Sequence, residues 1–314
     1  MKRASLLVAL GLALALPALA EEETVPLADF DTLWDYFDPA ATEARFRERL
    51  PAVVAAGDPD LHAQLLTQIA RSQGLQRRFA DARRTLDEAE RVLAGRGGVA
   101  ALRLLLERGR LLNAEGDPAA ALPYFSAALE AAKAEREDFH AVDAAHMLGI
   151  AAPGEAGLAW NLEAIAMAKD SRDERARGWL GSLLNNTGWR YHDADDYARA
   201  LAHFEAALEF RRERGKQPEL RIAEWTVARC LRSLGRLEEA LAIQRDLERQ
   251  LAAAGEAQDG YVFEELGELN LALGRGEDAR TYFARAHAVL ASDPWLQANE
   301  EGRLARIARL GGLK

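Results

Sequence analysis

The sequence predicts an all-α protein, a right-handed α-solenoid of about six helix hairpins with capping helices at both ends. Three observations support this prediction. A short neighbourhood around an alanine recurs at intervals of 39 or 40 residues, apolar residues in each copy follow helical spacing, and turn sequences separate the two helices of a copy. Self-similarity at such a period is typical of repeat proteins, in which each unit buries its apolar face against its neighbours.

The first 20 residues differ from the rest of the chain. Lys2 and Arg3 precede an apolar run over residues 6–16, and a cleavage site of the A-x-A type ends at Ala20. A membrane-spanning helix is the alternative interpretation, but it needs roughly 20 apolar residues, and three glutamates follow Ala20 directly. We therefore expect an export signal over residues 1–20, a periplasmic or secreted mature chain, and no membrane insertion after cleavage.

The composition limits the classes of partner. Without Lys2 and Arg3, 38 Lys and Arg residues stand against 50 Asp and Glu residues, which gives a net charge of about −12. This excess of negative charge disfavours nucleic acid and anionic membranes, because binding to both depends on positive side chains. The single cysteine, Cys230, cannot form an intramolecular disulfide, and its apolar helical position indicates a buried filler.

Residues 21–58 are predicted to be N-terminal capping helices. Apolar residues with i, i+3, i+4 and i+7 spacing indicate an amphipathic helical segment near their start. These residues are Phe30, Leu33, Trp34 and Phe37. Further helices are expected to begin at Asp38-Pro39 and Asp58-Pro59, because an aspartate followed by proline is typical of an N-cap and the first helical residue.

The repeat array is predicted to span residues 59–293. Its anchor alanines are Ala82, Ala121, Ala200, Ala240 and Ala279. Twelve residues earlier lie the small residues Ala70, Gly109, Gly188, Ala228 and Gly267, and four residues later lie Leu86, Phe125, Phe204, Gln244 and Phe283. Small residues on both helices of a hairpin allow close approach, and the large residue one turn later fills the space beside that contact.

These positions resemble the tetratricopeptide repeat. The fourth unit resembles it most clearly, through Leu184, Gly188, Tyr191, Tyr197, Ala200, Phe204 and Ala207. The resemblance covers roughly residues 60–290 in six units and implies helix hairpins stacked into a solenoid. The period of 39–40 residues exceeds the family's value of about 34, so longer helices or connections are expected. Helical-pair repeats of other kinds, with about 40 residues per unit, are the structural alternative.

The third unit departs from this pattern. Ala121 and Ala200 are 79 residues apart, so one weaker unit lies between them. We expect this unit to be centred near Ala159 and to keep Ala166 at the later alanine position, with Gly149 at the small position only after a two-residue slip, and no large apolar residue follows its anchor. A local irregularity is therefore expected, and the sequence leaves open whether it bends the solenoid or closes a pocket.

Residues 294–314 are predicted to be a C-terminal capping helix. Asp293-Pro294 supplies an N-cap and a first helical residue. The residues expected to face inward are Trp295, Leu304, Ile307 and Leu310.

No sequence pattern identifies an enzyme, a metal site or a cofactor site. The strongest metal-like cluster is His140, Asp143 and His146. Residues three apart drift by about 60° around a helix, so these three do not share one face. The cluster lacks the i, i+4 histidine pair and glutamate of helical zinc proteases, and no nucleophile-elbow motif is present. We expect a non-enzymatic protein without metal or cofactor.

The resemblance implies a concave groove, lined by the first helix of each unit, that holds a peptide or a segment of a protein. The predicted binding residues on this face are Arg71, Arg110, Asn113, His146, Asn185, Trp189, His192, Trp225, Arg229, Arg232, Glu264 and Glu268. Arginine suits bidentate binding of carboxylates and tryptophan supplies an apolar anchor. We therefore expect a segment with an acidic or C-terminal carboxylate near Asn185, Trp189, Trp225 and Arg229.

Two alternatives accompany this expectation. The tryptophans could instead pack between units, and the arginines could pair with Glu107, Glu224 or Glu264. For the function itself, an exported scaffold or adaptor of the bacterial cell envelope is the first interpretation. A sensor or carrier that encloses a small anionic ligand in a superhelical pocket is the second. The sequence leaves the partner, the pathway and the oligomeric state open.

Overall fold

The computed structural model describes residues 29–255 and 259–313, and the regular structure within them is helical. The helices pair into hairpins along the chain. These hairpins are α2 (Pro59–Leu75) with α3 (Phe79–Leu93), α4 (Val99–Ala114) with α5 (Pro118–Glu135), α6 (Asp138–Ala151) with α7 (Gly154–Asp170), α9 (Leu180–Asp193) with α10 (Tyr197–Arg214), α11 (Gln217–Ser233) with α12 (Leu237–Ala254), and α13 (Gly260–Ala272) with α14 (Gly276–Leu290). The six units expected from the repeat are all present.

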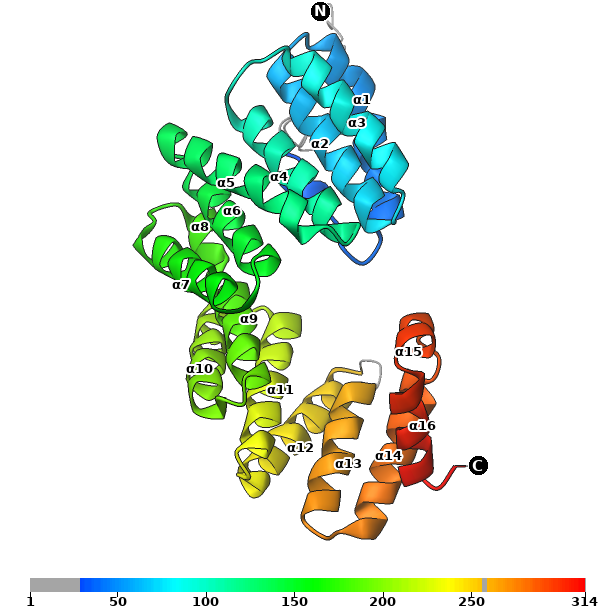
Figure 1. The fold of residues 1–314 in the computed structure, drawn as a ribbon. Coiled ribbons are helices and arrows are strands. Elements are labelled where there is room, and N and C mark those ends of the chain that lie inside the picture. Colours follow the sequence, from blue (N-terminus) through cyan, green and yellow to red (C-terminus); the bar gives the residue numbers. More distant parts are fainter. Residues whose placement is uncertain (1–28, 256–258, 314) are drawn as a thin grey trace, which may run out of the picture.

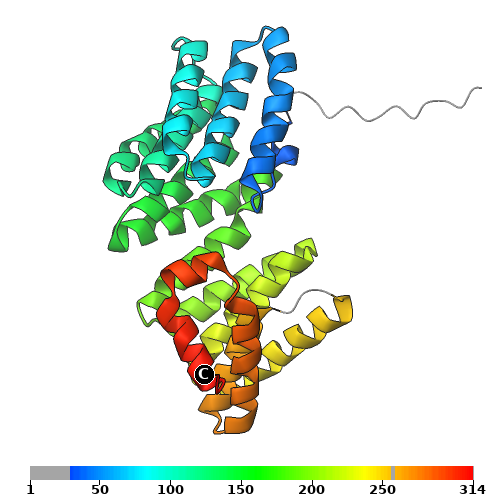
Figure 2. The same cartoon turned by 90° about the vertical axis from the view of Figure 1, so that its right-hand side faces the viewer.

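Elements outside the six hairpins complete the fold. They are the 3-10 helix η1 (Asp31–Leu33), α1 (Pro39–Ala55), α8 (Glu174–Gly178), α15 (Pro294–Asn299) and α16 (Glu301–Leu310). The hairpins follow one another around an open arc from α1 to α16 (Figure 1), and the side view shows two halves joined through the third and fourth units (Figure 2). The expected all-α solenoid is confirmed.

Aspartate N-caps begin several helices where the sequence predicts them. The Asp58 carboxylate accepts hydrogen bonds from the backbone amides of Asp60 and Leu61, at 2.9 and 3.3 Å. Asp38 and Asp293 cap α1 and α15 in the same way. Each cap satisfies backbone donors that the first helical turn leaves without an intrahelical partner.

The packing of a phenylalanine ring on a glycine holds three of the hairpins together. The pairs are Gly109 with Phe125, Gly188 with Phe204, and Gly267 with Phe283, and all three rings are fully buried. A Cβ atom on Gly188 would lie 2.5 Å from the Phe204 ring, so only glycine lets the helices approach this closely. Cys230 is buried as expected, and burial raises the pKa of its thiol to about 11.

The expected centre of the third unit, Ala159, is wrong by two residues. Ala159 and Ala166 are both exposed on α7, and the buried residue at the hairpin contact is Gly157. The side chain over Gly149 is that of Asn161, because a Cβ atom on Gly149 would lie 2.0 Å from the Asn161 Oδ1 atom. The connection between α6 and α7 is shorter than in the other units, and α8 is inserted after α7. These differences are the irregularity that the sequence indicates.

The expected amphipathic helix near the N-terminus does not form. Only η1 is helical there, and Phe37, expected to face inward, is fully exposed. The Asp35 carboxylate accepts the Phe37 amide at 3.0 Å, and the Asp35 amide donates to the Thr42 hydroxyl at 3.0 Å. These bonds give the backbone an alternative to helix, as short polar side chains often do. The expected export signal, residues 1–20, lies outside the described residues.

At the C-terminal end the cap consists of the two helices α15 and α16 rather than one. Leu304 and Ile307 are buried as predicted, whereas Trp295 is exposed. Among the described residues, no helix is both long enough and apolar enough to cross a bilayer.

Candidate functional site: the inner face of the solenoid

The predicted arginines of the N-terminal half form ion pairs that link successive first helices. Arg110 lies 2.6 Å from the Glu107 carboxylate and also bonds the Asp143 carboxylate of the next unit. Arg71 reaches the same Glu107 at 3.5 Å. The neighbouring guanidinium holds the pKa of Asp143 below its usual range despite complete burial of the carboxyl. The charges of Arg71 and Arg110 are therefore paired with carboxylates in contacts between units.

His140 and His146 lie buried beside this network on α6. Burial lowers the pKa of His140 to about 4, with the Arg103 guanidinium adding to the effect, and burial also lowers the pKa of His146. Asp143 faces Arg110, so the three residues of the metal-like pattern do not converge on one point. Within residues 29–255 and 259–313, no group of three or more potential metal ligands comes together.

Acidification should therefore destabilise the fold through His140. The unfolded histidine binds a proton below pH 6.5 and the folded one only near pH 4, so this contribution is complete above pH 6.5 and falls as the pH drops. Between pH 7 and pH 5 we expect a loss of about 2 kcal/mol in the free energy of unfolding. Urea denaturation at both pH values measures it. His140→Leu should reduce this loss, because it removes the titrating ring, whose nitrogens make no hydrogen bond that the substitution would break. An unchanged pH dependence would contradict the assignment.

Ion pairs also occupy the inner face at the C-terminal end. Arg232 binds the Glu265 carboxylate through two nitrogens at 2.7 and 2.9 Å, and the Arg229 Nε atom lies 3.3 Å from the same carboxylate. The predicted residues Glu264 and Glu268 pair with Arg303 and Arg306 of α16, respectively. The arginines thus pair with carboxylates, as the alternative interpretation anticipates, although Arg229 pairs with Glu265 rather than with Glu224 or Glu264.

The predicted aromatic residues meet at the middle of the arc. The Trp189 ring lies 5.2 Å from Phe204 and 6.3 Å from Trp225 of the next unit. The Trp225 indole nitrogen donates to the Tyr261 carbonyl at 3.3 Å, and His192 lies 2.9 Å from the Ser233 hydroxyl. Both tryptophans therefore bridge units, but each keeps part of its surface in solvent. Asn113 is also half-buried, on α4, and no side-chain bond is recorded for it.

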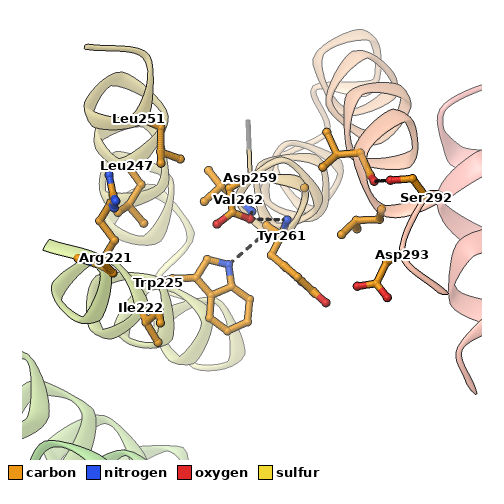
Figure 3. A pocket seen from close by; sticks show the side chains of 14 residues that line it. Arg221, Ile222, Trp225, Leu247, Leu251, Asp259, Tyr261, Val262, Ser292 and Asp293 are labelled. Atoms are coloured by element: carbon orange, nitrogen blue, oxygen red, sulfur yellow. Dashed lines mark hydrogen bonds between the residues drawn. The ribbon is translucent and has the colours of Figure 1, made fainter. Parts of the chain in front are cut away.

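Two hollows lie side by side along this face, at equivalent positions of successive units. The first, of about 190 Å³, is lined by Gly181, Ser182, Asn185, Asn186, Ala207, Arg211, Glu219, Ile222 and Ala223. The second, of about 810 Å³, is lined by Pro218, Arg221, Ile222, Trp225, Leu247, Leu251, Asp259, Gly260, Tyr261, Val262, Val289, Leu290, Ser292 and Asp293 (Figure 3). Ile222 belongs to both, and 60% of it is exposed.

The two hollows differ in chemistry. The first offers hydroxyl, amide and guanidinium groups from Ser182, Asn185 and Arg211, and the Glu219 carboxylate also lines it. In the second, Leu247 and Leu251 of α12 lie opposite Tyr261 of α13, with Trp225 between them (Figure 3). We call these the polar hollow and the apolar hollow.

Arg211 is an exception in the repeat. Eleven residues after the anchors of the other units, the chain has only apolar residues. They are Leu93, Ala132, Ala168, Leu251 and Leu290. Arg211 occupies this position in the fourth unit, where its guanidinium lies over Gly181: a Cβ atom there would be 2.5 Å from Nε. In the sixth unit, Leu290 lies over Gly260 in the same manner.

The Arg211 guanidinium has no anionic partner of its own. It donates to the Ser182 hydroxyl at 3.2 Å, and in the described part of the chain it makes no ion pair with a carboxylate. Burial lowers its pKa, and the field of Glu219 offsets this only in part. A half-buried charge without a partner is unfavourable. A bound carboxylate would therefore supply the negative charge that the Arg211 guanidinium lacks.

Comparison with solved structures places this arrangement among known folds. No protein-family model matches the sequence, and a search of curated proteins finds no match. Among solved structures, RapI without ligand has a TM-score of 0.69 at 10% identity, over 85% of this chain and 76% of that one. A signal transduction ATPase with a tetratricopeptide repeat sensor, from Pyrococcus horikoshii, has a TM-score of 0.63 at 15% identity. The alignment covers 86% of this chain and only 41% of the ATPase.

A third similar structure is that of NprR in complex with its cognate peptide NprX. It has a TM-score of 0.52 at 15% identity, over 90% of this chain and 82% of that one. The chain has the tetratricopeptide-repeat fold. These identities establish the architecture, and the chemistry of the site comes from this chain's own residues.

Sequence reasoning on the tetratricopeptide-repeat pattern found part of this site. Asn185 lines the polar hollow and Trp225 the apolar hollow, as predicted near this position. Arg211 was not predicted because it lies on a second helix, and Ile222 and Tyr261 were not predicted because they lie one turn before the predicted residues of their helices. The signal for Arg211 was present in the sequence, as a charged residue at an otherwise apolar position of the repeat.

Proposed function

We propose that this chain is a non-enzymatic scaffold or adaptor that binds an extended peptide or protein segment along α9, α11 and α13. The observation that supports it most is Arg211, which stands where other units have aliphatic residues and lacks a carboxylate partner. A half-buried charge without a partner is unfavourable in the free protein, and a ligand that pairs with this charge gives the residue a function. The ion pairs elsewhere on the inner face leave this guanidinium as the cation that a ligand would meet.

The two hollows define the chemistry of the ligand. A carboxylate, from an acidic side chain or a C-terminus, fits the polar hollow, where Arg211 offers a two-pronged donor and Asn185 an amide. A large apolar side chain fits beside Trp225 in the apolar hollow. Neighbouring helices lie about 10 Å apart, which an extended chain spans in about three residues. The ligand therefore carries its carboxylate and its apolar side chain about three positions apart.

Two further observations support a peptide ligand. NprR, whose fold resembles this one, was solved in complex with its cognate peptide. The apolar hollow is open, since Ile222 and Tyr261 at its rim are 60% and 37% exposed. An open hollow suits a segment that extends beyond it better than an enclosed small anion, so the carrier interpretation is less well supported. The export signal expected over residues 1–20 favours a role in the bacterial cell envelope.

Loss of either hollow should weaken binding. Peptides selected on the mature chain, residues 21–314, from a displayed random library should contain the predicted pair of residues. Arg211→Gln and Trp225→Ala should each raise the Kd of a selected peptide by about tenfold or more, as anchor residues of an interface do. Isothermal titration measures both values.

Arg212→Gln is the matched control, because Arg212 is the exposed neighbour of Arg211 on the same helix and only its distant pairing with Glu209 at 3.9 Å is lost. It should leave the Kd within about twofold, as expected for an exposed pair. Equal peptide affinities of the wild type, Arg211→Gln, Trp225→Ala and Arg212→Gln would contradict the proposed function. A selection that yields no binding peptide would also contradict it.

A further inference from the structure

The segment from Asp29 to Phe37, which we call the strap, crosses the inner face of the first units. The Trp34 indole donates to Gln68 of α2 at 2.9 Å. The Asp31 carboxylate lies 2.7 Å from Arg175 of α8 and 3.8 Å from Arg103 of α4. Asp31 and Arg175 are 144 residues apart in the sequence. The strap therefore occupies in cis the face on which this type of solenoid presents its first helices.

Aromatic contacts extend this binding mode. Trp34 and Tyr36 stack with ring centroids 4.8 Å apart, and the Arg71 guanidinium lies 5.5 and 5.6 Å from the two rings. Such cation–π contacts are favourable and depend on geometry. Arg71, predicted to bind a ligand, thus binds an aromatic pair of the chain itself.

Buried nitrogens without hydrogen-bond partners lie near Asp31 and Arg175. They are the Arg103 Nε and Trp179 Nε1 donors and the two nitrogens of the neutral His140 ring, one a donor and one an acceptor. The Glu137 carboxylate lies 3.5 Å from the His140 ring, and Arg103, Asp143, Arg175 and Asp31 are further charged groups that act on it. Buried donors are nearly always paired in folded proteins. Their concentration at one place indicates a site for an acceptor-rich, negatively charged group that Asp31 fills only in part.

The attachment of the strap is uneven along its length. Phe30 is buried against Phe46 and fixes its start, whereas the side chains of Asp31 and Arg175 are each about half exposed. Exposed ion pairs contribute little to stability. Trp34 also packs edge-on against Phe46, with ring centroids 5.3 Å apart, and Arg45 donates to the Leu33 carbonyl at 2.7 Å. The exposed Asp31 contact is therefore the weakest attachment of the strap, and Phe30 keeps the strap nearby when Asp31 and Trp34 are displaced.

We propose that the inner face formed by α2, α4 and α8 is a second binding site, for a protein segment with an acidic residue followed three positions later by a tryptophan. The strap fills this site in cis, with Asp31 and Trp34 as the two recognised residues. A segment of the same chemistry from a partner protein replaces it there. This site shares no residue with the polar and apolar hollows, so its test does not depend on the proposed function.

The test uses the mature chain, residues 21–314, and a fluorescent peptide with the sequence of residues 29–37. In the wild type the tethered strap competes at a high effective concentration, so the peptide should bind weakly. Asp31→Asn with Trp34→Ala should release the strap and lower the apparent Kd of the peptide at least tenfold, because the competent fraction rises. Fluorescence anisotropy measures both. In the released background, Arg175→Gln should raise the Kd again by about tenfold.

Asp29→Asn is the matched control, since the Asp29 side chain makes no recorded contact in the described structure, and it should bind the peptide as the wild type does. Circular dichroism verifies that each variant is folded, and Asp31→Asn alone replaces the double variant if that one is not. Equal peptide affinities of wild type and folded strap variant, or no binding to either, would overturn the proposal. Binding that Arg175→Gln leaves unchanged would also overturn it.

Discussion

Phe204→Ala should lower the free energy of unfolding by about 3–5 kcal/mol, because it removes a fully buried ring and leaves a cavity. The ring fills the contact between α9 and α10, where Gly188 presents bare backbone. It also contacts Trp189, so the loss extends to the aromatic centre of the inner face. Urea denaturation followed by circular dichroism measures the change.

Phe210→Ala on the same helix is the matched control. Phe210 is half-buried, and its ring lies under the Arg214 guanidinium at 4.7 Å rather than in the core. We expect it to cost about 1 kcal/mol, because only a partly buried ring is lost. Equal losses for the two variants would show that the glycine–phenylalanine contact does not hold the hairpin together.

Asp143→Ala should cost about 3 kcal/mol of stability. It leaves the Arg110 guanidinium, which is 14% exposed, without its partner on α6. Removing one member of a buried ion pair typically costs 3–5 kcal/mol, and we expect the lower end because Arg110 keeps Glu107 at 2.6 Å. The same denaturation experiment measures the loss.

Asp138→Ala serves as the control for this substitution, since Asp138 lies on the same helix at the surface and accepts a side-chain hydrogen bond only from the half-buried Ser171. Its effect should stay below about 1 kcal/mol. A loss for Asp143→Ala no larger than that would mean that Arg110 is not held by this network. Arg110 would then be available to a ligand, as the sequence alone suggested.

The repeat, its helices and its packing residues could be predicted because they follow from local spacing. Gly188 and Phe204 recur in the same relation in other units, and their contact is the one that the spacing indicates. The third unit was misplaced for a physical reason. The repeat period places the anchor near Ala159, whereas the shortened turn brings Gly157 to the contact, and Asn161 stands where other units have the large apolar residue.

The binding site was predicted only in part because it combines residues from six helices of three units. Asn185 and Trp225 lie on first helices and were found. Arg211 comes from the end of α10, and its importance depends on the absence of a carboxylate near it, which is a property of the folded chain. The strap could not be predicted either, since its contact with Arg175 joins distant parts of the sequence.

Amide hydrogen exchange of the mature chain, with and without a selected peptide, tests the central claim most directly. The account predicts slower exchange in the first halves of α9, α11 and α13 and at the ends of α10 and α12, where the two hollows lie. Exchange along α3 and α5 should not change. Protection confined to α2, α4 and α8, or to the outer helices, would contradict binding at Arg211 and Trp225.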